Sequence, residues 1–342
     1  MEFLKKANRL LFFLLAVFLA FIYLDAFLIP FGFGIFLAML IVPFSSFLEK
    51  HKVNTALSSL TSTLLLFICL GSLSYLFMYQ ISHFADQLPD VREEIQSTMQ
   101  SLQLQITSMT GVPPEEQQDI VDSRSDALWS GIESRIAAVI GGILDFAFKF
   151  MLVFIYVFLL LLYREKFRSF LISFHETEEE KENARDAVNS ISKVVYHYLW
   201  GRVQVMSALA VMYYVTFLVF GLPFALLVTL FGALITVIPY LGPLVSGIVP
   251  VIFAILFFED LSYILIFALC ILVIQLIESY VFEPFLIGKE VKLNALVVIV
   301  AVILGGTIWG VAGMILFVPM FATIKIIFNH SDGLRPLGSV LE

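Results

Sequence analysis

The stretch LPFALLVTLFGALITVIPYLGPLVSGIVPVIFAILFF, residues 222–258, runs for 37 residues without a charged side chain. About 20 apolar residues are enough for a helix to cross the roughly 30 Å of hydrocarbon in a bilayer. The stretch is therefore too long for one crossing. Prolines and glycines interrupt it at Pro239, Gly242, Pro243, Gly247 and Pro250. We predict two crossings here, or one crossing and a re-entrant hairpin.

The rest of the chain has the same character. Of its 342 residues, 60% are hydrophobic and 14% are charged, whereas about a quarter of the residues in a soluble domain are charged. We predict an all-α, polytopic integral membrane protein with about eight transmembrane helices. Its C-terminal half should contain broken or re-entrant hairpins, and amphipathic helices should lie outside the bilayer. The net charge of −8 comes without a large basic patch, so nucleic acid is not an expected partner.

The N-terminal apolar run covers residues 10–48 and contains a single charged residue, Asp25. As a helix it would be about 58 Å long, which is the length of two crossings. We place the reversal between these crossings at Pro30, Gly32 and Gly34. Asp25 is then interpreted as a boundary residue in preference to an ion ligand.

Lysine and arginine set the predicted orientation, because 16 of the 20 basic residues fall in cytoplasmic segments when the N-terminus is placed inside. This bias predicts a multi-pass protein of the bacterial inner (cytoplasmic) membrane with both termini in the cytoplasm. The predicted segments are a three-helix membrane segment (1–80), an acidic extracytoplasmic helical segment (81–142), a fourth transmembrane helix (143–163), a cytoplasmic helical segment (164–202), a C-terminal membrane core (203–328) and a cytoplasmic tail (329–342).

Two extramembrane helices have recognisable sequence signals. Apolar residues recur at helical spacing from Leu88 through Val91 and onward to Ile106, which predicts amphipathic helices in the acidic segment. Thr177 followed by Glu180 forms a capping box, which predicts the start of a helix in the cytoplasmic segment.

The interrupted segment 238–250 is the first candidate for a transport pathway, comprising Pro239, Tyr240, Gly242, Pro243, Gly247 and Pro250. Broken backbone at membrane depth survives where protein or a water-filled cavity satisfies its polar groups, and transporters place binding sites at such breaks. The alternative is a plain cytoplasmic turn between two spans.

The second candidate lies at the end of the span predicted over residues 261–282 and comprises Gln275, Glu278, Tyr280 and the following Glu283. Gln275, Glu278 and Phe282 share one helical face. If Glu278 faces a cavity, it could bind a proton or Na⁺, or hydrogen-bond a polar solute. The alternative is that this carboxylate lies at the level of the lipid headgroups.

Residues 293–328 are uncharged up to Lys325 and would form a helix of about 53 Å. We predict two short crossings or two half-helices. The glycines of this run, which are predicted to serve helix packing, are Gly305, Gly306, Gly310 and Gly313.

Enzyme chemistry is not expected. His-Glu-x-x-His and P-loop patterns do not occur in the sequence. The cysteines, Cys69 and Cys270, lie far apart in apolar runs, so neither a disulfide framework nor a metal site is predicted. We predict no catalytic residues and no cofactor.

The chain resembles the AI-2E family, the autoinducer-2 exporter-like or PerM proteins. The stretches that carry the resemblance are IPYLGPLVSGIVP (238–250), QLIESYVFEPFLIGKEVKLNALVVIVAVILGGTIWGVAGMILFVPMFATIKII (275–327) and, more weakly, YLWGRVQV (198–205). Trp200-Gly201-Arg202 departs from the Gly-Gln more usual in the family. The resemblance implies a transporter of small molecules or ions that forms a homo-oligomer, with a pentamer as one candidate.

Three functions stay open at this point. The first is export or facilitated passage of a small polar solute such as the quorum-sensing signal autoinducer-2. The second is Na⁺(Li⁺)/H⁺ antiport, in which Glu278 would titrate. The third is a non-transporting oligomeric scaffold in the lipid bilayer that binds partners through residues 81–142 or 164–202.

Overall fold

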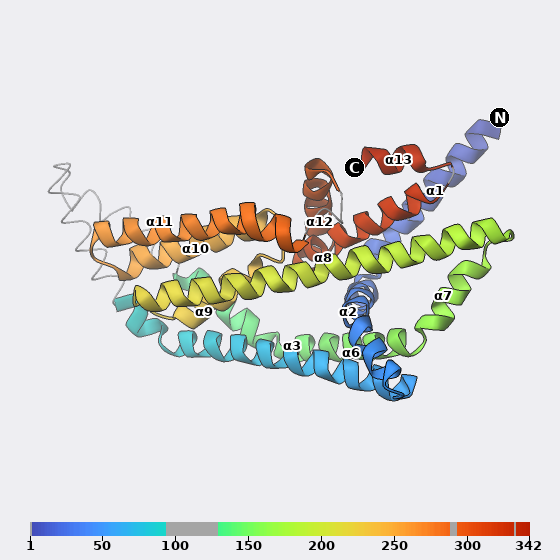
Figure 1. The fold of residues 1–342 in the computed structure, drawn as a ribbon. Coiled ribbons are helices and arrows are strands. Elements are labelled where there is room, and N and C mark those ends of the chain that lie inside the picture. Colours follow the sequence, from blue (N-terminus) through green and yellow to red (C-terminus); the bar gives the residue numbers. More distant parts are fainter. Residues whose placement is uncertain (1, 94–128, 288–292, 332) are drawn as a thin grey trace. The chain divides into compact units, whose positions relative to one another are not determined.

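The computed structural model describes residues 2–93, 129–287, 293–331 and 333–342. Within these ranges the regular structure is helical and contains no strand. The helices are α1 (Glu2–Tyr23), α2 (Asp25–Lys50), α3 (Thr55–Asp86), α6 (Ile143–Leu162), α7 (Arg164–Ser173), α8 (Glu178–Val219), α9 (Ala225–Ile235), α10 (Leu241–Phe257), α11 (Leu261–Ile277), the π-helix η1 (Glu278–Ile287), α12 (Ala295–Asn329) and α13 (Arg335–Val340) (Figure 1).

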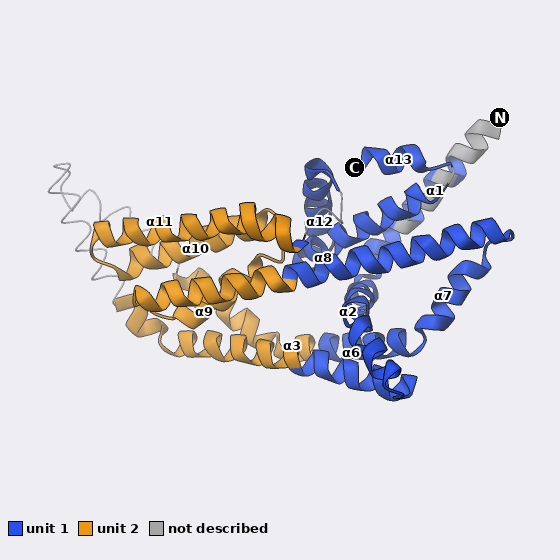
Figure 2. Cartoon of the chain, in the orientation of Figure 1, with its two compact units in different colours: residues 1–68, 148–202, 287–342 blue, residues 69–147, 203–286 orange. Residues whose placement is uncertain are grey.

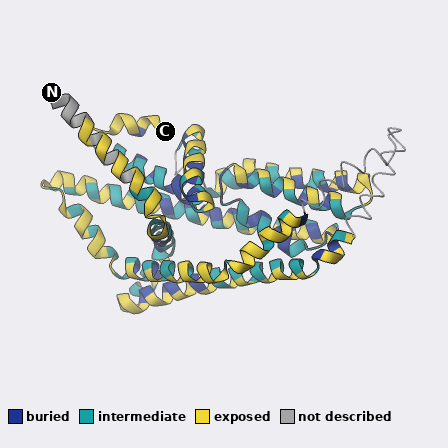
Figure 3. Ribbon diagram, turned by 180° about the vertical axis from the view of Figure 1, so that it is seen from behind, coloured by how far each residue is buried: buried dark blue, intermediate teal, exposed yellow. Residues whose placement is uncertain are grey.

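Among the described residues, six helical stretches are long and apolar enough to cross a membrane: α2, α3, α6, α8, α11 continued by η1, and α12. Many large apolar side chains of these helices are exposed, and Figure 3 marks the exposed positions in yellow. Leu144 of α6 is 84% exposed and Phe285 of η1 is 82% exposed. Such surfaces are stable in contact with lipid hydrocarbon, because exposing this much apolar surface to water is unfavourable in free energy. The predicted all-α polytopic membrane fold is confirmed.

The chain divides into two compact units (Figure 2). Unit 1 contains residues 1–68, 148–202 and 287–342, and unit 2 contains residues 69–147 and 203–286. Three long helices, α3, α6 and α8, run from one unit into the other. Each unit is described separately below.

In unit 1 the N-terminal apolar run is interrupted at Leu24, between α1 and α2. The prediction that Pro30, Gly32 and Gly34 end the first helix is wrong, since all three lie inside α2. Gly34 is instead a packing position: a Cβ atom there would lie 2.7 Å from the Tyr156 Cβ atom of α6. Asp25 does stand at the boundary, where its Oδ1 atom accepts the Ala26 amide hydrogen at 2.7 Å.

The helix α12 turns back on itself at Gly310, whose dihedral angles are φ 59° and ψ −140°. This conformation is essentially restricted to glycine. The two arms, residues 295–309 and 311–329, are about 22 Å and 28 Å long. The predicted pair of short helical segments is therefore present, with the break at Gly310. Because the arms fold together, α13 packs against α12, and its Gly338 lies beside Asn329.

Trp309, next to the α12 reversal, contacts the last turn of α1. The Trp309 indole Nε1 donates a hydrogen bond of 2.7 Å to the Phe21 carbonyl oxygen, which lies in the last turn of α1, where helical carbonyls lack an intrahelical donor. The Trp309 ring also stacks on the Phe21 ring, with centroids 5.1 Å apart, and meets the Phe317 ring edge-on at 5.3 Å.

The predicted capping box opens α8. The Glu180 amide donates to Thr177 Oγ1 at 3.2 Å, and the Thr177 amide donates to Glu180 Oε2 at 3.1 Å. The hydrogen bond from the Thr177 backbone is the main reason why the pKa of the Glu180 carboxyl lies below its ordinary value. The 42 residues of α8 then continue without a break from the predicted cytoplasmic segment into the predicted span.

In unit 2 the ends of the predicted acidic segment pack on the core. Leu88, Val91 and Trp129 form a buried cluster, with Phe224 packed against it. Burial of Leu88 and Val91 agrees with the helical spacing seen in the sequence. The remaining apolar positions of that pattern belong to residues 94–128, which lie outside the described residues.

Candidate functional site

The interrupted segment of the sequence forms a tight helical hairpin within unit 2. The helix α9 has 11 residues, and a length of about 16 Å covers only half of the hydrocarbon thickness. It packs against α10. By length, α9 is too short to cross the hydrocarbon alone, and the re-entrant hairpin stays a prediction.

The turn between α9 and α10 requires glycine at one position. Tyr240 at the turn has a positive φ of 62°, and Pro239 before it is buried. A Cβ atom on Gly242 would lie 2.4 Å from the Ile235 carbonyl oxygen and 2.5 Å from the Thr236 Cα atom. Both are backbone atoms that cannot rotate aside, so only glycine lets α10 begin this close to the end of α9.

Three polar side chains from three helices meet behind this turn. Ser246 of α10 and Tyr213 of α8 are both fully buried. The Gln275 Nε2 atom of α11 donates to Tyr213 Oη at 2.7 Å and to Ser246 Oγ at 3.1 Å. Tyr213 Oη donates to Ser246 Oγ at 3.2 Å, and that hydroxyl donates to the Pro243 carbonyl oxygen at 3.2 Å. We call Tyr213, Ser246 and Gln275 the polar triad.

Small residues make room for the polar triad. A Cβ atom on Gly232 of α9 would lie 3.4 Å from the Tyr213 ring, and one on Gly247 would lie 3.3 Å from Gln275 Nε2. Behind the triad, the Tyr213 ring stacks on the Phe217 ring at 5.6 Å. Packing against neighbouring helices and the hydrogen bonds among its members together fix the positions of the triad side chains.

The backbone changes character one turn beyond Gln275. The α-helix α11 ends at Ile277, and the π-helix η1 begins at Glu278 and contains Pro284. Proline lacks an amide hydrogen and cannot continue an α-helical ladder, and π-helical turns occur frequently at functional sites. The Glu278 side chain at this junction is fully buried. This burial favours a position inside the protein over one among the lipid headgroups.

The structure brings some of the predicted pathway residues together and leaves others apart. Gly247 lies against Gln275, and Pro250 is buried on α10. Tyr240 is 54% exposed and Tyr280 is 75% exposed, so neither ring belongs to the polar triad. Pro243 contributes its carbonyl oxygen as the last acceptor of the triad, and Glu283 on η1 is partly buried.

Sequence reasoning missed Tyr213. Its signal was available, since buried residues recur along α8 at helical spacing as Val205, Leu209, Tyr213 and Phe217. A tyrosine on the buried stripe of a membrane helix needs a hydrogen-bond partner for its hydroxyl group. The periodicity could therefore have indicated a polar contact, although not which helix supplies it.

The predicted packing glycines lie in unit 1, at the reversal of α12. Gly305 and Gly313 form the closest contact, because a Cβ atom on Gly305 would lie 2.3 Å from the Gly313 carbonyl oxygen. Gly306 lies beside the Met314 side chain of the other arm, and Gly310, also predicted to serve packing, is the turn itself.

Short and broken helices, a buried hydrogen-bonding triad and a π-helix within an apolar helical body are typical of membrane transporters. No metal-binding group of three or more His, Cys, Asp or Glu residues occurs in the part of the chain that the structure describes. Comparison with known proteins identifies the family: the model of the AI-2E family transporter matches residues 11–333. The chain belongs to the AI-2E transporter family.

Individual relatives are distant but match over most of their length. YrrI of Bacillus subtilis (strain 168) is 24% identical over 311 residues, which cover 88% of this chain and 86% of that protein. The AI-2 transport protein TqsA of Escherichia coli (strain K12) is 21% identical over 318 residues, covering 92% of this chain and 89% of TqsA. YueF of Bacillus subtilis (strain 168) is 25% identical over 296 residues, with coverages of 84% and 79%.

Proposed function

We propose that this protein exports a small, uncharged, hydroxyl-bearing solute of the autoinducer-2 kind across the bacterial inner membrane, with both termini in the cytoplasm. The observation that carries the proposal is the polar triad. Its three members present two hydroxyl groups and one carboxamide, all neutral, behind the break between α9 and α10. The similarity to TqsA supports the class of solute.

The chemistry of the triad suits exchange of hydrogen bonds with such a solute. Polar groups without partners cost several kcal/mol at membrane depth, so the triad satisfies itself when no solute is bound. A solute hydroxyl group can replace one of its internal bonds at little net cost, because one hydrogen bond is exchanged for another. Carboxylates or guanidinium groups would be required to bind an ionic solute with comparable strength.

Efflux from proteoliposomes loaded with autoinducer-2 tests this proposal. Gln275→Leu should lower the efflux rate about tenfold, because it leaves two buried hydroxyl groups without their donor at a cost of about 1–3 kcal/mol. Ser246→Ala should lower it in the same direction. Gln204→Leu and Ser207→Ala are matched controls, because both residues are exposed on α8. Efflux from the Gln275 and Ser246 variants at the wild-type rate would contradict the proposal.

A second candidate, Na⁺(Li⁺)/H⁺ antiport, is favoured by one observation: the Glu278 carboxyl is fully buried at the junction between α11 and η1. A carboxyl group at such a place is suited to bind a proton or a cation in turn. In everted vesicles with a pH-sensitive dye, addition of Na⁺ or Li⁺ should then move protons in the wild type and not in Glu278→Gln. Absence of proton movement in the wild type would exclude this candidate and leave solute export in place.

We further propose that the protein acts as a homo-oligomer. The family resemblance supports this, and the pentamer is the first assembly to test, by mass measurement of the detergent-solubilised protein.

A further inference from the structure

A cavity of about 440 Å³ lies within unit 1, between α2, α6, α7 and α8. Its lining includes both apolar and charged residues. The apolar residues include Ile35, Met39 and Val42 of α2 and Leu160 of α6, and the polar residues include Arg164, Glu165 and Arg168 of α7 and Asn189 of α8. An apolar wall joined to a basic end is the pattern of an amphiphile site.

The position of the cavity along the helices matches the depth of one lipid leaflet. Arg164 follows the last residue of the span α6 by two positions, so its guanidinium group lies where α6 leaves the hydrocarbon. On α2, Ser46 lines the polar end and Ile35 the apolar end. Eleven residues separate them, which corresponds to about 16 Å along the helix. The cavity therefore extends from the headgroup level into the hydrocarbon.

The composition of α7 is typical of a helix at a membrane surface. Phe170 and Phe174 are 57% and 68% exposed, and their rings pack edge-on with centroids 4.7 Å apart. Exposed aromatic residues on a short helix with basic residues are typical of helices that lie in the interface between lipid and water. Lys166 of the same helix lies over the Tyr163 ring at 5.0 Å, outside the lining of the cavity.

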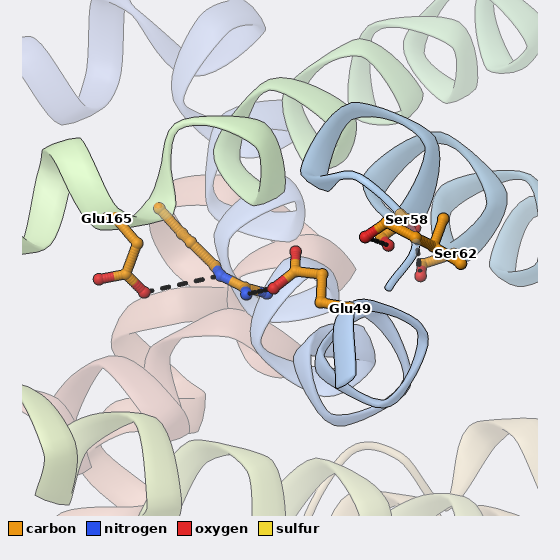
Figure 4. Close-up of polar contacts among 6 residues, drawn as sticks. Glu49, Ser58, Ser62 and Glu165 are labelled. Atoms are coloured by element: carbon orange, nitrogen blue, oxygen red, sulfur yellow. Dashed lines mark hydrogen bonds and ion pairs between the residues drawn. The ribbon is translucent and has the colours of Figure 1, made fainter. Parts of the chain in front are cut away.

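The partners of Arg164 and Arg168 show whether these guanidinium groups could also bind an anion. Arg164 Nη2 pairs with the Glu49 carboxylate, and Arg164 Nε lies 3.8 Å from Glu165 Oε1 (Figure 4). The buried Arg164 Nη1 atom has no hydrogen-bond partner among the residues that the structure describes. Arg168 Nη2 donates to Asn189 Oδ1 at 3.0 Å, an uncharged acceptor. Since the Glu165 side chain is 73% exposed, solvent screens its charge.

We propose that this cavity binds an anionic phospholipid of the adjacent leaflet. Its phosphodiester group accepts hydrogen bonds from the guanidinium groups of Arg164 and Arg168, and one acyl chain lies along the apolar wall of α2 and α6. Guanidinium groups bind phosphate oxygens with charge-assisted hydrogen bonds, and both arginines line the cavity. The site lies within unit 1, and it does not depend on the proposed transport function.

Thermal unfolding of the full chain in detergent, with and without added phosphatidylglycerol, tests the site. Phosphatidylglycerol should raise the unfolding temperature of the wild type. Arg168→Gln should need about tenfold more lipid for the same shift, because one charge-assisted bond is lost. Lys166→Gln is the matched control, since it removes the same charge from the same helix outside the cavity. It should respond as the wild type does.

Two further probes test whether the phosphate group or the acyl chains alone are sufficient for binding. Glycerol phosphate supplies the phosphate without chains, and diacylglycerol supplies the chains without phosphate. Neither should stabilise the wild type. Equal stabilisation by glycerol phosphate, equal loss of the response in Lys166→Gln, or an unchanged response in Arg168→Gln would each overturn the proposal. If Arg168→Gln does not fold, Val42→Trp, which fills the apolar wall, should lose the response, and its retention would overturn the proposal.

Discussion

Replacing Gly305 with alanine is expected to prevent α12 from folding back on itself. The added Cβ atom would lie 2.3 Å from the Gly313 carbonyl oxygen and 2.5 Å from its carbonyl carbon. Both are backbone atoms of the opposite arm, so relief requires the arms to separate. Overpacking usually costs about 1–3 kcal/mol, and a contact between two backbones belongs at the upper end of this range.

The measurement is the yield of monodisperse protein in detergent, together with its thermal unfolding. Gly305→Ala should lower both strongly, and Gly313→Ala should do the same, because its Cβ atom would lie 2.0 Å from the Gly305 carbonyl oxygen. Gly306→Ala is a neighbouring control: its Cβ atom would meet the end of the flexible Met314 side chain at 2.7 Å, which can move aside. Equal effects of Gly305→Ala and Gly306→Ala would show that α12 does not reverse as described.

Gly242→Ala is expected to open the α9–α10 hairpin and to abolish transport. The Cβ atom would lie 2.4 Å from the Ile235 carbonyl oxygen, so α10 would have to move away from the end of α9. Ser246 lies one helical turn further along α10, and its hydroxyl group would move out of hydrogen-bond range of Tyr213 and Gln275. A shift of about 1 Å is enough to break bonds of 3.1 and 3.2 Å.

Efflux from proteoliposomes measures this effect, with protein yield as a second readout. The matched control is Gly141→Ala, also in unit 2, since a Cβ atom on Gly141 would have no neighbour within 4 Å. We expect wild-type efflux from Gly141→Ala and none above the lipid background from Gly242→Ala. Normal efflux from a well-folded Gly242→Ala protein would mean that the turn does not position the polar triad for transport.

The presence of helix breaks in this chain could be predicted from the sequence, but their exact positions could not. The uncharged runs and their prolines and glycines were sufficient to predict that residues 222–258 and 293–328 each contain a break. Apolar periodicity does not locate a reversal within a uniformly apolar run, however, because every position satisfies the pattern equally well. For this reason the end of the first helix was predicted at Pro30 to Gly34, whereas the helix is interrupted at Leu24.

Proline and glycine also occur at packing contacts inside membrane helices, which explains why Pro30 and Gly34 were wrongly predicted to form a turn. In α2, Pro30 is buried and Gly34 admits the Tyr156 side chain of α6. Small residues at helix contacts and residues at turns have the same identities, and the chain around them decides which role each takes. The same ambiguity applies to Gly310, which was predicted to serve helix packing and forms the turn of α12.

The candidate site could be predicted in part. Gln275 and Glu278 were identified because polar groups at membrane depth are costly and rarely placed without purpose. Tyr213 was not identified, and neither was its meeting with Ser246 and Gln275, since these residues come from three helices up to 62 positions apart in the chain. Hydrogen-bond partners at such separations depend on helix packing, and local sequence patterns do not indicate which helices pack together.

The sequence alone determined that this protein lies in a membrane as helices, because its long uncharged runs can be stable only where hydrocarbon surrounds them and the backbone satisfies its own hydrogen bonds. It also determined which stretches must be broken. Only the tertiary structure decided where the chain reverses, which glycines touch backbone, and which polar side chains meet. Those outcomes depend on distances between helices, which are set by close packing of side chains from remote parts of the chain.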